Sequence, residues 1–382
     1  MMTFACTAIA GLAIVLAAET TGPRGGDFGE PRVVVAAPAD ARSAHLSWPK
    51  IVTTPNGNLV AAFSAGIGHN IGSSGPAVSV STDRGATFSP PRLLRRFPED
   101  DDRYDDCGNM ALGLADDGAV VLLAMAYRGD EANTIFGWRS EDEGASWEQI
   151  DTRALAENRT GSVYGHVFSV PGRGLAVAGH YRSPSQPHAE GIWVAFSKDG
   201  GRSWGAAERV AERRLFEPAV VFVAGRFVGL IRDGASTPPY WQLVGDGERW
   251  SLEPSPVRPT EAKTRLRAPS PFLVVDADNP SRLWALESQR FGGEGGGAIW
   301  LWSADATALD WQRLGLVIEF PAGNEEHVDF TYPWMSPLGD GRWFLVFYSG
   351  RRRGTSAIYG MELDLRAVHG TGNLQRTGTI AR

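Results

Sequence analysis

One short motif occurs three times in this chain, at residues 81–88, 140–147 and 197–204. Each copy reads Ser-x-Asp-x-Gly-x-(Ser/Thr)-aromatic, and successive aspartates are 59 and 57 residues apart. Ser and Asp side chains accept hydrogen bonds from the backbone N–H groups of tight turns, and Gly supplies the positive φ that such turns need. A turn that returns at this interval predicts a repeat architecture, a solenoid or a propeller.

Two weaker copies, centred on Asp246 and Asp305, continue the series and leave room for a sixth unit in the last part of the chain. Each interval offers about four short alternating runs, Gly and Pro are plentiful, and no long stretch has a period of 3.6. The sequence therefore predicts an all-β fold, a six-bladed β-propeller over about residues 30–365. A strand near residues 33–35 is expected to close it against the last blade.

The N-terminal 29 residues differ from the rest. Residues 4–18 are apolar and have the length of a signal-peptide core, although no basic residue precedes them, and residues 20–29 are rich in Gly. The run is short for a transmembrane helix. We expect a signal-like segment and linker over residues 1–29, and the propeller with a short C-terminal tail over residues 30–382. The expected location is secreted or periplasmic, with cytoplasmic as the alternative.

Charge and cysteine content exclude several classes of partner. The net charge is −7 and no basic stripe is visible, so we expect no nucleic-acid partner and no membrane partner. The two cysteines, Cys6 and Cys107, form neither a disulfide framework nor a zinc pattern. No cofactor and no metal ion is predicted, and the oligomeric state is not determined by the sequence.

The repeated turns resemble the Asp-boxes of the sialidase superfamily, which indicate the fold alone because they also occur in propellers without enzymatic activity. Three further segments resemble sialidase active-site strands. One carries Glu217 before an apolar strand and Arg232 at the end of the next strand. The second carries Arg290, and the third, at residues 329–341, carries Tyr332.

The resemblance implies a role for each of these four residues. Tyr332 would be the nucleophile, as in sialidases, which depart from the two-carboxylate rule of most glycosidases. A phenol with a pKa of about 10 needs a base, and Glu217 would take its proton. Arg232 and Arg290 would bind a substrate carboxylate through paired hydrogen bonds.

Two expected groups are absent. Sialidases carry Tyr-Arg-Ile-Pro before the first strand, and alignment on Pro49 puts Ser47 in place of the arginine. Lys50 is close by in sequence but points to the opposite face of the strand from Pro49. The next loop, residues 66–75, contains no carboxylate to serve as acid/base. The substrate is therefore expected to differ from an ordinary sialoside.

Other ionisable residues are candidates to complete the site. His69 lies in the loop that lacks the carboxylate and is a candidate general acid. Asp105 or Asp106, before the first strand of the second unit, is the alternative. A polar cluster precedes the first strand of every unit, and six such clusters would converge on one polar pocket. This adds candidate substrate ligands from three units: Lys50, His166 and Arg267.

Three functions remain open at this point. The leading prediction is a sialidase-like glycoside hydrolase that acts on an acidic or modified terminal sugar, so that an oligosaccharide or polysaccharide, expected to be anionic, is the partner. A polysaccharide lyase acting on a uronate-containing glycan would use Tyr332 or a histidine as base. A glycan-binding propeller without catalysis is the third. Of these three functions, only the glycoside hydrolase requires Glu217 beside Tyr332.

Overall fold

The computed structural model describes residues 22–155, 159–234, 240–259, 266–267, 269–291 and 296–369. Most of the signal-like segment predicted for residues 1–29 lies outside them. Apart from four 3₁₀ turns, the regular structure of these residues is β-strand. The turns are η1 (Ala41–Ser43), η2 (Arg153–Leu155), η3 (Glu325–His327) and η4 (Arg366–His369). Within the described residues, no helix is long and apolar enough to cross a membrane.

The strands form four sheets, and most neighbouring strands are antiparallel. One sheet contains β15 (Leu215–Val223), β16 (Arg226–Asp233), β17 (Tyr240–Gly245) and β18 (Trp250–Pro254). Another contains β1 (Arg24–Gly25), β19 (Leu266–Arg267), β20 (Phe272–Val275), β21 (Arg282–Phe291), β22 (Gly297–Asp305) and β23 (Gln312–Phe320).

The two other sheets have eight strands each, and a short parallel pairing divides each into two antiparallel groups. In the first, β7 (Asp106–Leu114), β8 (Val120–Arg128), β9 (Ala132–Ser140) and β10 (Glu148–Gln149) adjoin β11 (Ser162–Val170), β12 (Gly174–His180), β13 (Ile192–Ser197) and β14 (Glu208–Ala211). In the second, β3 (His45–Thr53), β4 (Leu59–Gly66), β5 (Gly75–Ser81) and β6 (Arg92–Leu93) adjoin β2 (Arg32–Val35), β24 (Asp329–Gly339), β25 (Arg342–Gly350) and β26 (Ser356–Asp364).

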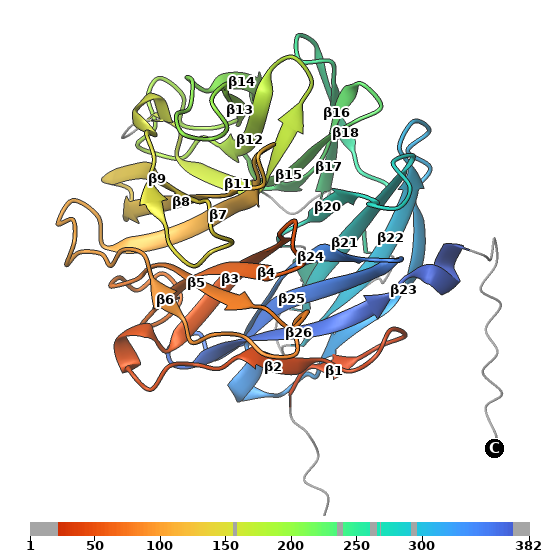
Figure 1. Cartoon of the computed structure of the whole chain (residues 1–382), viewed down its shortest axis with the longest axis horizontal. Helices are drawn as coiled ribbons and strands as arrows, with labels where there is room; N and C mark the ends of the chain where they lie inside the picture. Colours follow the sequence, from red (N-terminus) through yellow and green to blue (C-terminus); the bar gives the residue numbers. More distant parts are fainter. Residues whose placement is uncertain are drawn as a thin grey trace, which may run out of the picture.

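The two ends of the described chain meet in this last sheet. β2 pairs with β26, as expected for a closing strand, and the red and blue ends of the chain lie side by side in Figure 1. The all-β prediction is confirmed, whereas the six-bladed closure stays a prediction.

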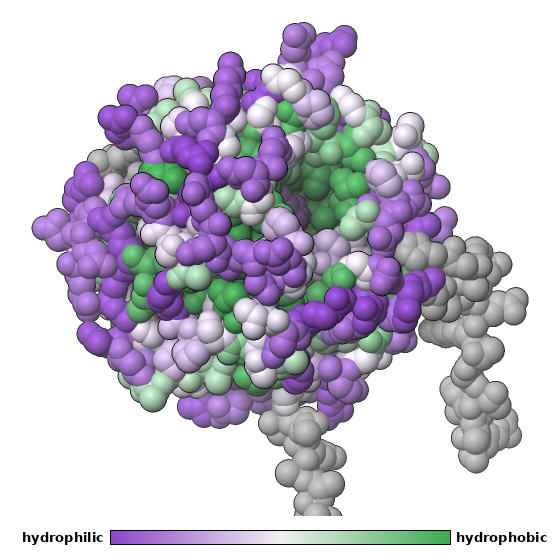
Figure 2. All heavy atoms as spheres, viewed as in Figure 1, coloured by the Kyte–Doolittle hydropathy of each residue, from purple (hydrophilic) through white to green (hydrophobic). Residues whose placement is uncertain are grey.

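Apolar packing between successive antiparallel groups forms the core. One cluster joins Val60 and Val78 to Leu112 and Leu122, so the β3–β6 group packs on the β7–β10 group. Similar clusters connect the following groups along the chain. β4 and most of β8 are buried on both faces, which is why they read as continuous apolar runs. Figure 2 shows hydrophilic residues around the periphery of one face and hydrophobic residues around a hollow nearer its centre.

The repeated motif forms the turn that its sequence predicts. In the copy that contains Asp142, Gly144 N donates to Ser140 Oγ at 2.8 Å and Ser146 N donates to the Asp142 carboxylate at 2.7 Å. The other two copies have the same bonds at 2.8–2.9 Å. Gly144 has φ +91°, and a Cβ there would press on Val60 of a neighbouring group. The turns therefore link adjacent groups.

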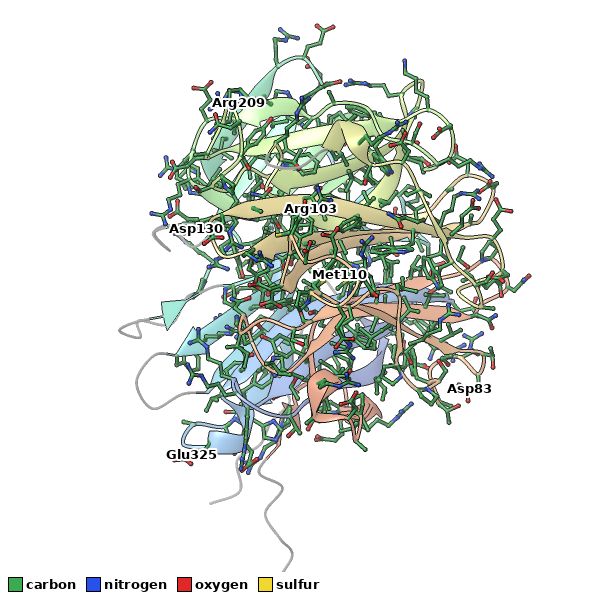
Figure 3. All side chains as sticks on the ribbon, turned by 90° about the vertical axis from the view of Figure 1, so that its left-hand side faces the viewer. Asp83, Arg103, Met110, Asp130, Arg209 and Glu325 are labelled. Atoms are coloured by element: carbon green, nitrogen blue, oxygen red, sulfur yellow. The ribbon has the colours of Figure 1, made fainter. Side chains whose placement is uncertain are left out.

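These turns lie away from the loop that leads to β24. Figure 3 shows Asp83, in the first motif, on the opposite side of the body from Asp130 and Glu325. Glu325 begins η3, which directly precedes β24. The first motif therefore meets the far end of β24, where Arg84 donates to Leu338 O at 3.0 Å, and not the end that begins at Asp329.

Asp199→Ala should lower the free energy of unfolding by about 1–2 kcal/mol. Three donors lose their acceptor: the Ser203 backbone N–H, the Ser203 hydroxyl and the Ser197 hydroxyl. Urea unfolding measures this change. Asp130→Ala, in the exposed β8–β9 turn, is the control and should change stability little. Catalytic turnover of folded Asp199→Ala protein should remain, and its loss at full stability would contradict a purely structural role.

Candidate functional site

The first strands of five antiparallel groups, β3, β7, β11, β15 and β24, are each interrupted by a register shift, and three of these shifts contain a left-handed residue other than glycine. The antiparallel register shifts between Ser47 and Lys50 in β3, between Phe216 and Ala219 in β15, and between Thr331 and Trp334 in β24. The bulged residues with left-handed backbones are Trp48 (φ 55°), Glu217 (φ 55°) and Tyr332 (φ 54°), and proline follows each.

A left-handed backbone costs free energy in a residue other than glycine and marks positions that the surrounding structure determines. Bulges of this kind re-aim side chains beside functional sites. The three side chains therefore occupy equivalent positions on three strands.

The bulges bring Tyr332 and Glu217 into contact. The Tyr332 hydroxyl donates a short hydrogen bond to Glu217 Oε1. Arg232 Nη1 donates to the same oxygen at 2.9 Å, and Ser270 N donates to Oε2 at 2.9 Å. Both members of the pair are buried.

The surroundings keep the glutamate charged and the tyrosine neutral. Burial by itself raises the pKa of Glu217, but the charge of Arg232 and the hydrogen bonds from Tyr332 and Ser270 lower it to about 2. Burial and the adjacent Glu217 carboxylate raise the pKa of Tyr332. The resting pair is thus a carboxylate facing a phenol, which is the state in which the carboxylate can accept the phenolic proton.

Arg290 lies on the other side of Tyr332. Its Nε donates to Phe330 O at 2.9 Å and its Nη2 donates to Tyr348 Oη at 3.1 Å. Nη2 is 3.6 Å from Asp329 Oδ1. Each of the two predicted arginines is therefore already close to a carboxylate, Arg232 to Glu217 and Arg290 to Asp329.

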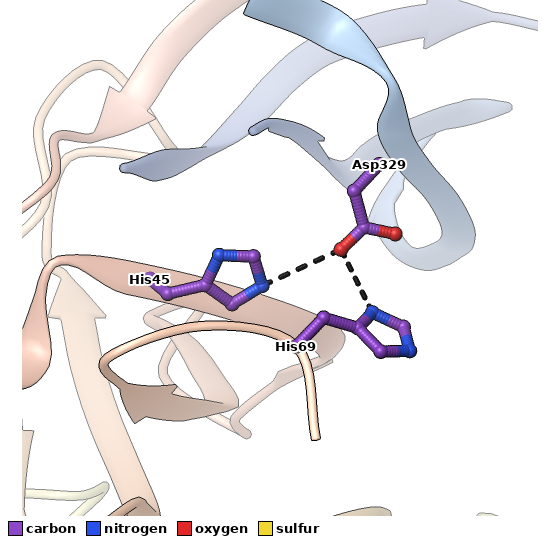
Figure 4. A group of neighbouring side chains, drawn as sticks. All are labelled: His45, His69 and Asp329. Carbon is purple, nitrogen blue, oxygen red and sulfur yellow. Dashed lines mark hydrogen bonds and ion pairs between the residues drawn. The ribbon is translucent and has the colours of Figure 1, made fainter. Parts of the chain in front are cut away.

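His69 is held by Asp329, which comes from the start of β24. Figure 4 shows both His69 and His45 directed at one oxygen of this carboxylate. His69 Nδ1 is 2.7 Å and His45 Nε2 is 3.4 Å from Asp329 Oδ2, while Tyr348 Oη donates to Oδ1 at 2.8 Å. Burial raises the pKa of Asp329, but the two histidines and the charge of Arg290 outweigh it and lower the pKa. An ionised Asp329 directs the Nδ1 proton of His69 toward itself and leaves Nε2 to exchange a proton.

His45, His69 and Asp329 also form the group that could hold a metal ion among the described residues, with their ligand atoms within 4.8 Å of one another. The short contact from His69 to Asp329 is a hydrogen-bond distance, and His45 Nδ1 donates to Gly354 O at 3.0 Å. The guanidinium of Arg290 beside Asp329 disfavours a second cation. Hydrogen bonding accounts for His69 and for His45 Nδ1 without an ion, whereas the buried His45 Nε2 has no hydrogen-bond partner among the residues that the structure describes.

Asp106 anchors the loop that carries His69. Its carboxylate accepts from Gly72 N at 3.2 Å and from Tyr127 Oη at 3.0 Å, and it also bonds the Ser74 hydroxyl. Burial raises the pKa of Asp106. Asp105 is instead half-buried and lies 3.8 Å from Arg128. Of the candidate acids, His69 packs against Trp48, with 5.1 Å between the ring centroids, and Trp48 lies 6.3 Å from Tyr332.

Lys50 and His166 lie beneath the pocket. Lys50 is fully buried, and its Nζ is 4.5 Å from the ring centroids of both Tyr164 and Trp334. The aromatic rings favour the charged form, but burial dominates and lowers the pKa of Lys50 to about 7. His166 Nε2 is 2.9 Å from Leu273 O, and burial lowers the pKa of His166 to about 4. In this arrangement neither side chain is exposed to a ligand as a cation.

Arg267, the remaining candidate, is in β19, where its backbone pairs with that of Arg290. Its side chain lies outside the described part of the structure. Trp48, Tyr348 and Ser270 are site residues that sequence reasoning missed. A repeated signal pointed to two of them, since an X-Pro pair lies within β3, β15 and β24, at Trp48, Glu217 and Tyr332, and just before β20, at Ser270.

No protein-family model matches this sequence, and no curated protein matches it. Solved structures do match. A protein of unknown function from Dyadobacter fermentans aligns over 90% of this chain and 100% of its own, with a TM-score of 0.68 and 19% identity. The NanB sialidase from Streptococcus pneumoniae aligns over 88% of this chain and 70% of its own, with a TM-score of 0.64 and 12% identity. The intramolecular trans-sialidase from Ruminococcus gnavus aligns over 87% of this chain and 97% of its own, with a TM-score of 0.62 and 14% identity.

Lys50→Met should change how stability depends on pH. Folding lowers the pKa of Lys50 from 10.5 to about 7, so between these values the unfolded chain holds a proton that the folded protein has released. Stability at this site therefore rises from about pH 7 to pH 10, by at most about 1.4 kcal/mol per pH unit, and Lys50→Met removes the rise.

Urea unfolding at pH 6, 8 and 10 measures the stability difference between the wild type and Lys50→Met. Lys198→Met, at an exposed position, is the control and should give a difference that does not vary with pH. A constant difference for Lys50→Met as well would contradict the lowered pKa.

The all-β strand arrangement of this chain agrees with that of the matched solved structures. The matched structures resemble this chain along most of its length, although their sequences are 12–19% identical to it. This chain therefore has a divergent sialidase-like fold.

Proposed function

We propose that this protein is a glycoside hydrolase that uses Tyr332 as its nucleophile and Glu217 as the base that activates it. The hydrogen bond from the Tyr332 hydroxyl to the ionised Glu217 carboxylate carries the proposal. As the phenolic oxygen forms a bond to the anomeric carbon, its proton moves to Glu217 and the bond to the leaving oxygen breaks. Sialidases among the matched structures make this chemistry a reasonable expectation for the shared fold.

His69 is the proposed general acid. Its Nδ1 is bound to Asp329, so Nε2 is the atom that would donate a proton to the leaving oxygen. In the second half of the reaction Nε2 would take a proton from water, the water oxygen would replace Tyr332 on the anomeric carbon, and Glu217 would return the phenolic proton. This assignment replaces the loop carboxylate that the sequence lacks.

The proposed substrate is a glycan with an acidic or modified terminal sugar, and not an ordinary sialoside. Ser47 stands where a sialidase arginine is expected, and Lys50 is buried below the pocket. The lyase alternative would release an unsaturated sugar that absorbs near 235 nm, which a hydrolase product does not. Product mass and absorbance, read together on an acidic-glycan panel, separate the two.

The finer architecture is part of the same proposal. Six antiparallel groups of strands follow one another, beginning at β3, β7, β11, β15, β19 and β24. We infer that they are six blades around one axis. Their inner strands would then be β3, β7, β11, β15, β20 and β24, the strands that surround the Tyr332–Glu217 pair.

Tyr332→Phe and Glu217→Gln should each lower kcat by roughly 10³-fold or more, because one removes the nucleophile and the other removes its base. Steady-state kinetics on the best substrate of the panel measures the loss. Tyr359→Phe, on β26 and packed on Phe347, is the matched control and should keep turnover. Unimpaired kcat in a folded Tyr332→Phe protein would rule out the mechanism.

His69→Ala should slow hydrolysis most for glycosides with poor leaving groups. The expected loss is roughly 10²–10⁴-fold for an alkyl leaving group and much less for a nitrophenyl group, which departs without protonation. His188→Ala is the control, because His188 contacts Arg209 and not Asp329. An equal loss for both leaving groups would show that His69 is not the general acid.

A further inference from the structure

An aromatic ring stands on β3 at the position equivalent to Glu217 on β15 and Tyr332 on β24. Trp48 has the same left-handed backbone and the same following proline. Its ring centroid is 6.3 Å from that of Tyr332 and 5.1 Å from that of His69. Trp48 is 5% exposed and Tyr332 is 6% exposed, so the two residues are buried to a similar extent. The indole thus packs against both the proposed nucleophile and the proposed acid.

The same strand places no arginine beside Tyr332. Ser47 is buried, and its backbone pairs with Ser64 of β4. Lys50 is enclosed by Tyr164 and Trp334, and burial lowers its pKa to about 7. The β3 side of the site therefore presents an aromatic ring, and its lysine is buried.

The remaining charges of the site offset one another. Arg232 is 2.9 Å from Glu217, and Arg290 is 3.6 Å from Asp329. A carboxylate brought into this buried region would be desolvated, and Arg232 and Arg290 would each have to share their charge between it and the carboxylate already beside them. A neutral ligand avoids this cost.

Apolar side chains surround the acid. Val33, Ile67, Ile71 and Val328 are the large apolar side chains that are exposed in the described part of the chain. Ile67 and Ile71 lie two residues on either side of His69, and Val328 directly precedes Asp329. Three of the four therefore lie within two residues of His69 or Asp329 in the sequence.

We propose that Trp48 is a substrate-binding residue that selects an uncharged pyranose, whose C–H face packs against the indole. Aromatic rings present a large apolar surface of fixed geometry to such a face. The leaving group contacts Ile67, Ile71 and Val328. The proposal rests on the proposed function only in taking the ligand to be a glycoside. It narrows the proposed substrate class from an acidic or modified sugar to a modified sugar without charge.

Binding of thioglycosides tests the proposal, because the sulfur link resists hydrolysis and binding is measured apart from catalysis. The probes are the two anomers of phenyl thioglucoside and phenyl thiogalactoside, phenyl N-acetylthioglucosaminide, and the uronate counterparts of the two hexosides. Isothermal titration of the wild-type protein should show at least one neutral compound binding tenfold or more tightly than its uronate. Trp48→Ala should weaken that binding at least tenfold, and Trp48→Phe should weaken it less.

Trp48→Arg should reverse the preference toward the uronate, because it places a cation without a carboxylate partner on β3. Trp311→Phe, at a tryptophan whose Nε1 bonds Gln242 outside the site, is the control and should bind like the wild type. Thermal unfolding establishes that each variant is folded. Tighter binding of uronates by the wild type, unchanged binding by folded Trp48→Ala, or no binding of any probe would each overturn the proposal. Neutral binding without turnover of the corresponding O-glycosides would overturn the proposed hydrolase and leave the role of Trp48 standing.

Discussion

The bulges in the inner strands are the constraint on which the site depends. A regular strand sends alternate side chains to opposite faces, where here they meet the neighbouring sheets. At Glu217 and Tyr332 this alternation is interrupted by a left-handed residue followed by proline. The strain of this conformation is held by the antiparallel pairing on both sides of each bulge. The hydrogen bond between two residues 115 positions apart is thus a consequence of two local backbone distortions.

Electrostatics then determine the resting protonation states. Glu217 and Asp329 are both buried, which by itself disfavours their charge. Arg232 and a backbone N–H keep Glu217 ionised, and Arg290 with two histidines does the same for Asp329. The two arginines are therefore needed to maintain a base and to orient His69, whatever they contribute to substrate binding. Because each arginine already stabilises a carboxylate of the protein, the site can contain two arginines and still bind the uncharged sugar that we propose.

Stability and function are carried by different parts of each strand group. The Ser–Asp–Gly turns link neighbouring groups through glycines that tolerate close approach, such as Gly144 against Val60. The bulges lie in the inner strands, and Asp83 of the first turn is on the opposite side of the body from the loop that precedes β24. Asp106 is an exception to this separation of stabilising and functional residues. Its carboxylate stabilises the loop that carries His69 by accepting hydrogen bonds from Gly72 N and Tyr127 Oη.

The sequence by itself determined the all-β class, the turns at Asp83, Asp142 and Asp199, and the pairing of Tyr332 with Glu217 and Arg232. These follow from local hydrogen-bonding patterns and from motifs that fix a side chain within one strand. Only the tertiary structure showed that Asp106 is bonded to Gly72, Ser74 and Tyr127, whereas His69 bonds Asp329 through Nδ1, which is why His69 is the acid that we propose. It also placed Lys50 beneath the pocket and Trp48 in it, because a bulge shifts the alternation by which a strand's faces are read from sequence. The Asp329 cluster was decided in the same way, as His45, His69 and Asp329 are brought together by strand packing over 260 residues or more of chain.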